Sequence, residues 1–415
     1  MSGDTAGHSH DHCCDPAGWT VSGLLAEIAE VGRGADGSYS RFSLDEADTR
    51  LRRWFIDHAR AAGLEVGTDD DATIWAWWGQ PGPDAVLTGS HLDSVPGGGA
   101  YDGPLGVVSS LVAVARLRAA GLAPSRPLAV VVMADEEGGR FGMPCLGARL
   151  ATGELDPQTA LALTDRGGVS LAEALQSAGH DPHRVGRSDL VTGACCFVEL
   201  HVEQGRALAD LDAPVAIATA VRPHGRWRAR FVGEGNHAGT TVLADRHDPV
   251  VPLGATILAA RSCASTAGAV ATVGRVEVEP NGTNVIASAA TAWLDCRAES
   301  EQTVRDVVEA VETVSRQAAA KEGCTVEWTR ESWTPRTEFS GNLRARMAEV
   351  LGHEVPHLST GAGHDAAVLA GHVPAAMLFV RNPTGASHTP AESASDEDCE
   401  AGAVALQAVL EDLLR

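Results

Sequence analysis

Acidic residues and histidines recur directly after short apolar runs, and this placement limits the fold more than any other feature of the chain. The apolar run at 85–88 precedes GSHLD at 89–93, and the run at 128–133 is followed by DEEG at 135–138. Apolar runs of this length, bounded by glycine and polar residues, are typical of buried strands. In an open α/β sheet, functional side chains gather beyond the carboxyl ends of the strands. The pattern therefore predicts one site formed by several strand ends.

The beginning and the end of the chain share an alternation of helical and extended patterns. Strands that alternate with helices in this way indicate a mostly parallel sheet. Besides the two buried strands, the predicted elements are helices at 44–62, 107–119, 341–351 and 396–414, an exposed strand at 73–78 and a buried strand at 375–380.

The middle of the chain has a different pattern, in which neighbouring strands pair and two helices lie between them. The strands at 213–221 and 226–232 are expected to pair with each other. The other predicted elements are strands at 270–278, 291–297 and 325–328 and helices at 249–264 and 303–321. Because 415 residues exceed one typical core, we predict an α+β domain at 211–327, inserted into a discontinuous domain of residues 18–210 and 328–415.

Composition excludes several classes of partner. The formal net charge of −23 repels nucleic acid phosphates and anionic membranes. No apolar run approaches the roughly 20 residues of a membrane span, and no signal peptide pattern opens the chain. The nine cysteines lack CxxC spacing, so we expect mostly buried thiols rather than disulfides or a zinc ribbon. Together these features predict a cytoplasmic protein.

Residues 1–17 lack apolar periodicity and are predicted to form a disordered tail. They include three histidines and two adjacent cysteines, which are His8, His10, His12, Cys13 and Cys14. An adventitious metal ion could bind there, although a solvated tail is the simpler interpretation.

Five residues at the strand ends carry the candidate chemistry. His91 alone fits a packed histidine as well as a metal ligand, but Asp93 is near enough to hold its second ring nitrogen. Asp102 lies in a glycine-rich turn, where carboxylates are commonly just solvated. Glu136 and Glu137 follow a strand buried on both faces, where adjacent acids cost free energy unless metals or protons offset their charge. Their side chains point in opposite directions, so one can bind a metal while the other moves protons.

Two further histidines complete a possible metal site. His201 lies in ELHVEQG and His388 in GASHTP, each just after an apolar run. Three histidines with carboxylates and no thiolate suit Zn²⁺ or Mn²⁺ in a hydrolytic site. The GxSxG elbow of serine hydrolases and the P-loop nucleotide motif do not occur.

At these residues the chain resembles the M20 metallopeptidase superfamily. Within it, the chain is similar to the ureido-hydrolysing branch of N-carbamoyl-L-amino acid hydrolases, β-ureidopropionases and allantoate amidohydrolases. The matching segments, between residues 89 and 392, are GSHLDSVPGGGAYDG, ADEEGGRFG, ELHVEQG, GNHAGTT, NGTNVIA, DCR, GAGHDA and MLFVRNPTGASHTPAE. HVEQG is typical of the branch, since many relatives have a carboxylate in place of this histidine.

The resemblance implies a zinc-peptidase-like catalytic domain with a mixed, mostly parallel sheet, and an inserted ferredoxin-like α+β domain that serves as lid and dimerisation surface. It implies two divalent metal ions, Zn²⁺ or Mn²⁺ by preference, with Co²⁺ or Ni²⁺ as possible substitutes. In the implied ligand set, Asp102 bridges the two ions, one of which also binds His91 and His201 and the other Glu137 and His388. Glu136 would be the general base, supported by Asp93.

The resemblance also implies contacts to the substrate. The residues concerned are Gln204, His237, Asn284, Arg297 and His364. Simpler interpretations stay open: Arg297 could be solvated, Asn284 could be a turn residue, and His237 could cap a helix near 239. His364 with Asp365 could equally mark a helix start. Arg381, after the last strand, is a weak indication of allantoate as substrate.

The leading hypothesis is a binuclear amidohydrolase that cleaves the carbamoyl C–N bond of a small ureido acid, such as allantoate or an N-carbamoyl-L-amino acid, releasing ammonia and carbon dioxide. The alternatives are an M20 aminoacylase or dipeptidase that cleaves an amide or peptide bond, and a non-catalytic binding protein on the same fold. We also expect a homodimer formed through the inserted domain, because a small α+β insert has a sheet edge and helices to cover.

Overall fold

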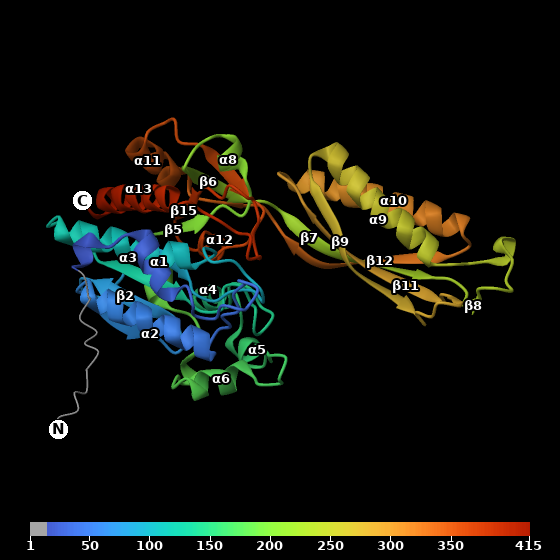
Figure 1. The fold of residues 1–415 in the computed structure, drawn as a ribbon, viewed down its shortest axis with the longest axis horizontal. Helices are drawn as coiled ribbons and strands as arrows, with labels where there is room; N and C mark the ends of the chain where they lie inside the picture. Colours follow the sequence, from blue (N-terminus) through green and yellow to red (C-terminus); the bar gives the residue numbers. More distant parts are fainter. Residues whose placement is uncertain (1–14) are drawn as a thin grey trace, which may run out of the picture. The chain divides into compact units, whose positions relative to one another are not determined.

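The computed structural model describes residues 15–415, so most of the predicted tail, including its histidines and both of its cysteines, lies outside the described residues. The end of that tail is not disordered, because Pro16–Gly18 form a short 3-10 helix, η1, capped by the carboxylate of Asp15. The chain divides into two compact units (Figure 1). Unit 1 comprises the chain up to Thr219 together with Glu338–Arg415, and unit 2 comprises Ala220–Thr337.

Unit 1 is built on a nine-stranded sheet of order β1-β2-β4-β3-β5-β15-β6-β13, with β14 paired to β6. The four central strands, β4, β3, β5 and β15, run parallel. The strands are β1 (Glu65–Thr68), β2 (Ile74–Trp78), β3 (Val86–His91), β4 (Leu128–Met133), β5 (Cys196–Val202), β6 (Val215–Val221), β13 (Thr337–Glu338), β14 (His357–Thr360) and β15 (Ala375–Val380).

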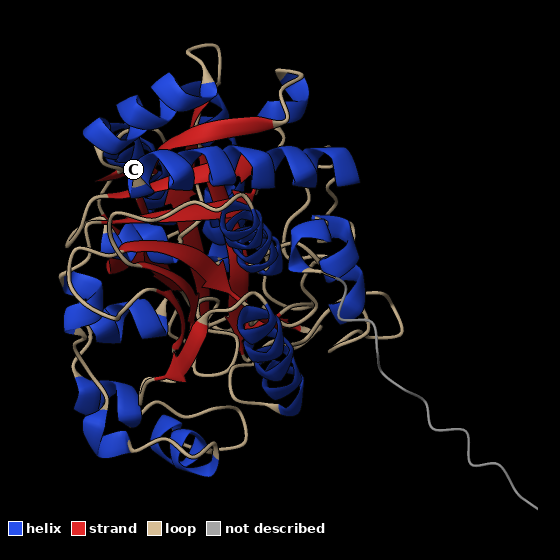
Figure 2. Ribbon diagram, turned by 90° about the vertical axis from the view of Figure 1, so that its left-hand side faces the viewer, coloured by secondary structure: helices blue, strands red, loops and turns tan. Residues whose placement is uncertain are grey.

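Helices lie on both sides of this sheet (Figure 2). The helices of unit 1 are α1 (Val21–Ile28), α2 (Glu46–Ala61), α3 (Pro104–Ala119), α4 (Leu146–Thr152), α5 (Pro157–Leu161), α6 (Leu171–Ser177), α7 (Asp189–Thr192), α8 (Ala207–Asp210), α11 (Gly341–Leu351), α12 (Asp365–Leu369) and α13 (Asp396–Leu414), with a 3-10 turn η2 at Pro182–Arg184. The predicted mixed, mostly parallel α/β architecture is therefore confirmed.

The central strands have the sequence that this position requires. β3, β4, β5 and β15 are buried along their whole length. Near-continuous apolar sequence suits strands that are covered by helices on both faces. α3 is also buried almost all round, because its sequence is apolar on nearly every side. Since parallel strands end at the same edge of a sheet, the segments that close these four strands meet there.

Unit 2 contains an antiparallel sheet of order β12-β7-β11-β9, with α9 and α10 on one face (Figure 1). The chain order is βαββαβ, the ferredoxin-like arrangement. Its elements are β7 (His224–Val232), α9 (Val250–Ala267), β9 (Val270–Glu279), β11 (Ala289–Arg297), α10 (Glu301–Lys321) and β12 (Thr325–Thr334), with a small pair β8 (Asn236–His237) and β10 (Val285–Ile286) and a 3-10 turn η3 (Leu243–Asp245).

Two predictions about strands are wrong. β6 does not pair with β7; it pairs antiparallel with β15 and stays in the large sheet. Unit 2 therefore begins and ends later in the chain than the predicted limits of 211 and 327. The strand at 73–78 is not exposed, because β2 lies between β1 and β4 and its side chains Trp75 and Trp77 are buried.

α9 has an unusually apolar outer side. By length and composition it is the one helix among residues 15–415 that could span a membrane, and a third of the 18-residue span is buried. It packs on α10 and β9, as expected for a helix of a folded unit. Val251 and Leu258, seven residues apart and thus on one side of the helix, are 54% and 72% exposed. Exposed apolar side chains gathered on one helix face are typical of an interaction surface.

Candidate metal centre

The five predicted ligands come from strands and loops at one edge of the unit 1 sheet. His91 is the last residue of β3, and His201 lies near the end of β5. Asp102 precedes α3 in a turn where Gly103 has a φ of +85°, and a Cβ on that glycine would come 2.5 Å from the His91 ring. Glu137 follows β4, and His388 follows β15 with a φ of +59°. The topology thus places residues far apart in sequence beside one another.

These residues form two groups that share one carboxylate. In the first group, Oδ1 of Asp102 lies 3.6 Å from Nε2 of His91 and 3.2 Å from Nε2 of His201. In the second group, Nε2 of His388 lies 3.5 Å from Oδ2 of Asp102 and 3.3 Å from Oε2 of Glu137. Within each group the candidate ligand atoms all lie within 4.8 Å of one another. Asp102 therefore presents one oxygen to each group.

The burial of these atoms fits divalent cations. Among the described residues, Nε2 of His91, Nε2 of His201 and Oε1 of Glu137 are buried and have no hydrogen-bond partner. Buried polar atoms without hydrogen-bond partners cost free energy and are rare. Three of them in one cluster therefore indicate that the cluster binds a ligand, for which a metal ion is suited. The other ring nitrogen of His201 meets the main-chain oxygen of Val202 at 2.9 Å, which leaves Nε2 free to coordinate. Nitrogen and oxygen donors without thiolates suit Zn²⁺ or Mn²⁺.

The electrostatics of the centre also favour a cation. Burial alone would lower the pKa of His91, but the carboxylates of Glu136, Asp102 and Asp93 together raise it well above its ordinary value. Burial would likewise lower the pKa of His201, yet Asp102 raises it to about 9. A field that retains protons on histidines attracts metal ions by the same negative charge.

Asp93 organises the two glutamates in a way that differs from the prediction. Nδ1 of His91 contacts the main-chain oxygen of Asp93 at 3.0 Å, whereas the Asp93 carboxylate is 3.7 Å away. That carboxylate instead accepts the main-chain N–H groups of Glu136 and Glu137, both at 3.1 Å. Asp93 therefore holds the main chain of both acids in place, while its carboxylate stays within ion-pair distance of the His91 ring without a hydrogen bond to it.

Glu136 is placed apart from the shared carboxylate. Its Oε2 lies 3.6 Å from Nε2 of His91, and its Oε1 accepts the thiol of Cys145 at 3.4 Å. Burial raises the pKa of Glu136 well above its usual range. A carboxyl group with a raised pKa beside a metal site is suited to accept and return a proton near neutral pH.

The matching family profile is described as Peptidase family M20/M25/M40 and covers residues 87–412. The chain belongs to this family. The resemblance deduced from the motifs is thereby confirmed.

Several relatives of this M20 chain match it over almost its whole length. It is 36% identical to an N-carbamoyl-L-amino acid amidohydrolase of Geobacillus stearothermophilus, over 92% of this chain and 95% of that protein. It is 32% identical to an allantoate amidohydrolase of Bacillus subtilis, over 94% and 96% of the two chains. An amidase of the hydantoinase/carbamoylase family from Burkholderia multivorans has the same fold, with a TM-score of 0.85, 27% identity and coverage of 95% and 97%.

Glu199 is a residue of this M20 centre that the sequence analysis did not single out. It is fully buried in β5, accepts from Ser90 Oγ at 2.8 Å and from the Ala366 N–H at 3.1 Å, and forms a third candidate group with His201 and His364. An acid within an otherwise apolar strand was the available signal. His364 is the N-cap residue of α12, which confirms the predicted helix start, and its buried Nε2 has no hydrogen-bond partner among the described residues.

Two residues predicted or considered as substrate contacts make other contacts in unit 1. Nε2 of Gln204 donates to Oδ2 of Asp102 at 2.6 Å, so Gln204 belongs to the centre, with its buried Oε1 unpartnered among the described residues. Arg381 makes a two-point contact with Asp398, at 2.9 and 2.8 Å, and also reaches Asp212 at 3.0 Å. Because ion pairs occupy this guanidinium, the indication of allantoate drawn from Arg381 is lost.

The other three predicted substrate residues lie in unit 2, at opposite ends of its sheet. His237 pairs with Val285, and the Ala238 N–H donates to the Asn284 oxygen at 3.1 Å, so His237 and Asn284 are neighbours. No helix starts near 239; Nδ1 of His237 instead accepts the Gly239 N–H. Arg297, at the far end of β11, makes a fork with Asp295.

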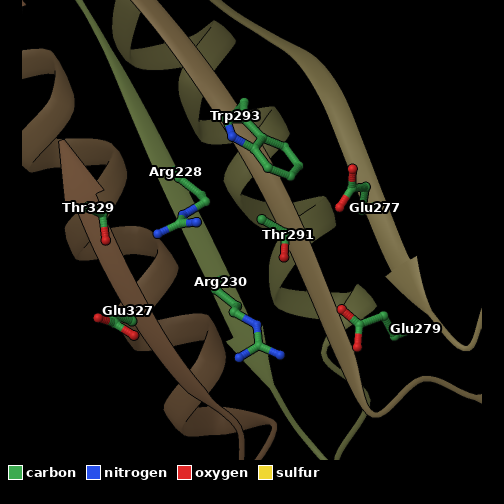
Figure 3. Close-up of a pocket in the computed structure, with 8 residues that line it drawn as sticks. All are labelled: Arg228, Arg230, Glu277, Glu279, Thr291, Trp293, Glu327 and Thr329. Atoms are coloured by element: carbon green, nitrogen blue, oxygen red, sulfur yellow. The ribbon is translucent and has the colours of Figure 1, made fainter. Parts of the chain in front are cut away.

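A hollow of about 420 Å³ lies on the face of the unit 2 sheet that the helices leave open (Figure 3). Arg228 and Arg230 line it together with Glu277, Glu279 and Glu327. Charges of both signs alternate across this face, and its lining contains neither histidine nor cysteine. None of the candidate metal groups among the described residues includes a residue of this hollow.

Proposed function

We propose that this chain is a binuclear metal-dependent amidohydrolase that cleaves the carbamoyl C–N bond of a small ureido acid and releases ammonia and carbon dioxide. The observation that carries the proposal is the shared Asp102 carboxylate, which offers one oxygen to each of two histidine-containing groups. The relatives named as N-carbamoyl-L-amino acid amidohydrolase and allantoate amidohydrolase support the choice of a carbamoyl C–N bond as the bond that is cleaved.

Two divalent ions would be held by the two groups around Asp102. His91 and His201 would complete one ligand set, and Glu137 and His388 the other. When bound, such a pair of ions polarises a carbonyl and lowers the pKa of water toward 7. Zn²⁺ and Mn²⁺ fit this donor set best, while Co²⁺ and Ni²⁺ share its ligands.

Glu136 is the proposed general base and acid. Its position beside the centre lets it take a proton from the attacking water and return one to the leaving nitrogen. The Asp93 carboxylate accepts the main-chain N–H of Glu136 at 3.1 Å. This hydrogen bond restricts the positions that the Glu136 carboxylate can take. His364, with an unpartnered buried nitrogen, is placed to donate to or accept from the substrate carbonyl region.

The substrate carboxylate is proposed to bind Arg297 and Asn284, while His237 polarises the ureido carbonyl. An arginine fork matches a carboxylate in two-point geometry, as it already does with Asp295. β11 separates the two ends: its first residue, Ala289, pairs with Val232 and its last, Arg297, with His224. Eight residue steps of strand span roughly 27 Å, too far for a small acid.

A homodimer resolves this separation, because one subunit can supply Arg297 while its partner supplies His237 and Asn284. Two surfaces of unit 2 support such pairing. β9, a strand of ten residues, pairs only with β11 in the described sheet and so forms one of its edges, and the neighbouring α9 exposes Leu258. Exposed sheet edges and apolar helix faces are commonly covered in symmetric dimers. The proposed partner is therefore a second copy of this chain, with unit 2 serving as dimerisation domain and lid.

The cytoplasm is the proposed location of the enzyme. The seven cysteines in the described part of the chain are all free thiols, and five of them are buried. Free thiols suit a reducing compartment.

A substrate panel with two readouts tests the reaction. The panel contains allantoate, several N-carbamoyl-L-amino acids, N-carbamoyl-β-alanine, N-acetyl amino acids and dipeptides, and each is assayed for released ammonia and for a newly formed amine. Ammonia from a ureido acid supports the proposal. Turnover restricted to N-acetyl amino acids or dipeptides would instead establish the amidase or peptidase activity.

A further inference from the structure

The carboxylate of Glu392 is buried behind the turn that carries Asp102. One of its oxygens, Oε1, accepts the main-chain N–H groups of Tyr101 at 2.8 Å and Asp102 at 3.0 Å. The residue is 6% exposed. The two partners lie about 290 positions earlier in the chain. Glu392 thus connects its own loop to the turn before α3 by hydrogen bonds to the main chain of Tyr101 and Asp102.

The same short segment also carries His388. The Glu392 N–H donates to the Thr389 oxygen at 3.1 Å, which closes a turn between the two side chains. His388 itself has a φ of +59° and places Nε2 3.5 Å from Oδ2 of Asp102. The segment from His388 to Glu392 therefore contacts Asp102 in two places. The His388 imidazole lies beside its carboxylate, and the Glu392 carboxylate accepts its main-chain N–H.

Gly99 makes this close approach possible. A Cβ on Gly99 would lie 2.3 Å from Oε1 and 2.4 Å from Cδ of Glu392. Contacts that short do not occur between real side chains, so any larger residue at 99 would displace the carboxylate. The Glu392 side chain can therefore reach the turn from Gly99 to Asp102 only because residue 99 is a glycine.

We infer that Glu392 is a positioning residue, which fixes the main chain of Asp102 and thereby sets the shared carboxylate relative to His388. The inference rests on the proposed function, in which Asp102 serves both metal sites. Outer partners of metal ligands typically contribute about 10- to 100-fold to metal affinity. Glu392 acts on the ligand through its main chain, so its effect is expected on metal binding before it is expected on substrate binding.

Glu392→Ala and Glu392→Gln separate positioning from charge. Zn²⁺ affinity of each purified full-length apoprotein is measured by competition with a chromophoric chelator. We expect the alanine variant to bind Zn²⁺ about 10- to 100-fold more weakly than wild type. The glutamine variant keeps an oxygen acceptor for both N–H groups and should recover most of the affinity.

Asp69 provides the matched control. One oxygen of this carboxylate, in the loop between β1 and β2, accepts the main-chain N–H groups of Asp71 and Thr73. Asp69→Ala removes the same kind of tie at the edge of the sheet and should leave Zn²⁺ affinity unchanged. Hydrogen exchange at the amides of Tyr101 and Asp102 should be faster in Glu392→Ala than in wild type, and unchanged in Asp69→Ala.

The outcomes separate this inference from the proposed function. If wild type binds no Zn²⁺, the proposed function fails. If wild type binds Zn²⁺ and Glu392→Ala binds it equally well, or if Glu392→Gln is as weak as Glu392→Ala, the positioning role is overturned. If Glu392→Ala does not fold, Gly99→Ala replaces it, and unchanged Zn²⁺ affinity in that variant overturns the inference just as clearly.

Discussion

Oδ1 of Asp102 lies 3.2 Å from Nε2 of His201, although the two residues come from a turn before α3 and from the strand β5. Burial would raise the pKa of Asp102, but the two neighbouring histidines hold it well below its usual range. The two histidines therefore favour the charged form of this carboxylate, which is the form that binds a cation. This relationship, repeated on its other oxygen by His388, is the basis of the predictions below.

Glu136→Gln should preserve the metal centre and abolish most of the turnover. The amide keeps the shape of the side chain but cannot take a proton from water, and general base catalysis contributes about 10²- to 10⁴-fold. The measurement is kcat for ammonia release together with bound metal per chain. Near-normal kcat with full metal content would remove Glu136 from the role of base.

His388→Ala should remove one metal ion and leave the other. His388 belongs to the second group alone, whereas His91 and His201 belong to the first. Metal per chain, measured on protein dialysed against excess Zn²⁺, should fall from two toward one. His372→Ala is the control, because that histidine is exposed and pairs with Glu154. Equal metal content in both variants would contradict the assignment of two groups.

Asp71→Asn should stabilise the protein at neutral pH. Burial, followed by the charges of Asp69 and Asp70, raises the pKa of Asp71 to about 7, although the Gly186 N–H favours its charged form. The folded state therefore retains a proton that the unfolded chain loses near pH 4, and this group lowers the free energy of unfolding as pH rises from 4 to 7.

The asparagine keeps an acceptor for that N–H group and removes the titration. Its gain in the free energy of unfolding over wild type should grow from pH 5 to pH 7.5 by at most about 3 kcal/mol, measured by urea unfolding. Asp57→Asn, at an exposed position on α2, controls for the change in net charge. Parallel pH profiles of Asp71→Asn and wild type would show that Asp71 ionises normally.

Leu258→Glu should convert a dimer into monomers. Leu258 is 72% exposed on α9, and a charge there would be buried without a partner in the proposed interface. Sedimentation velocity at micromolar concentration gives the mass. The comparison variant is Leu211→Glu, which changes a 55% exposed leucine of unit 1 and should remain dimeric. A monomeric wild type would rule out the dimer itself.

Mixed dimers test whether His237 acts on the partner's centre. Glu136→Gln and His237→Ala are each expected to be nearly inactive alone. After denaturation and joint refolding, mixed dimers would contain one complete centre, and random pairing should restore about a quarter of wild-type activity. No recovery, with mixed dimers present, would mean that His237 serves its own subunit.

The catalytic unit could be predicted because its strands are long apolar runs with polar residues directly after them. β4 and β15 were predicted with the bounds they have. β6 was assigned to the wrong sheet because Arg222 and Pro223 alone separate it from β7, a spacing typical of a hairpin. Its true partner, β15, lies more than 150 residues away, and local pattern carries no information about such pairing.

Some residues of the metal centre could likewise be predicted from the sequence, whereas others could not. His91, His201 and His388 could be found because each closes or follows an apolar run. Glu392 could not be singled out, since a loop glutamate four residues after a histidine has no distinguishing pattern until the fold places it behind Asp102. The carboxylate of Asp93 was expected beside the imidazole, where it lies at 3.7 Å, but its hydrogen bonds to Glu136 and Glu137 depend on the three-dimensional path of the loop after β4.

Metal removal and return, followed by ammonia release, tests the central claim most directly. Wild-type protein is stripped with a chelator, titrated with Zn²⁺ or Mn²⁺, and assayed on the best ureido acid of the panel. The account predicts no ammonia from the stripped enzyme and recovery that is complete at two ions per chain. Ammonia release that is indifferent to the chelator, or complete without any added metal, would contradict a two-metal amidohydrolase.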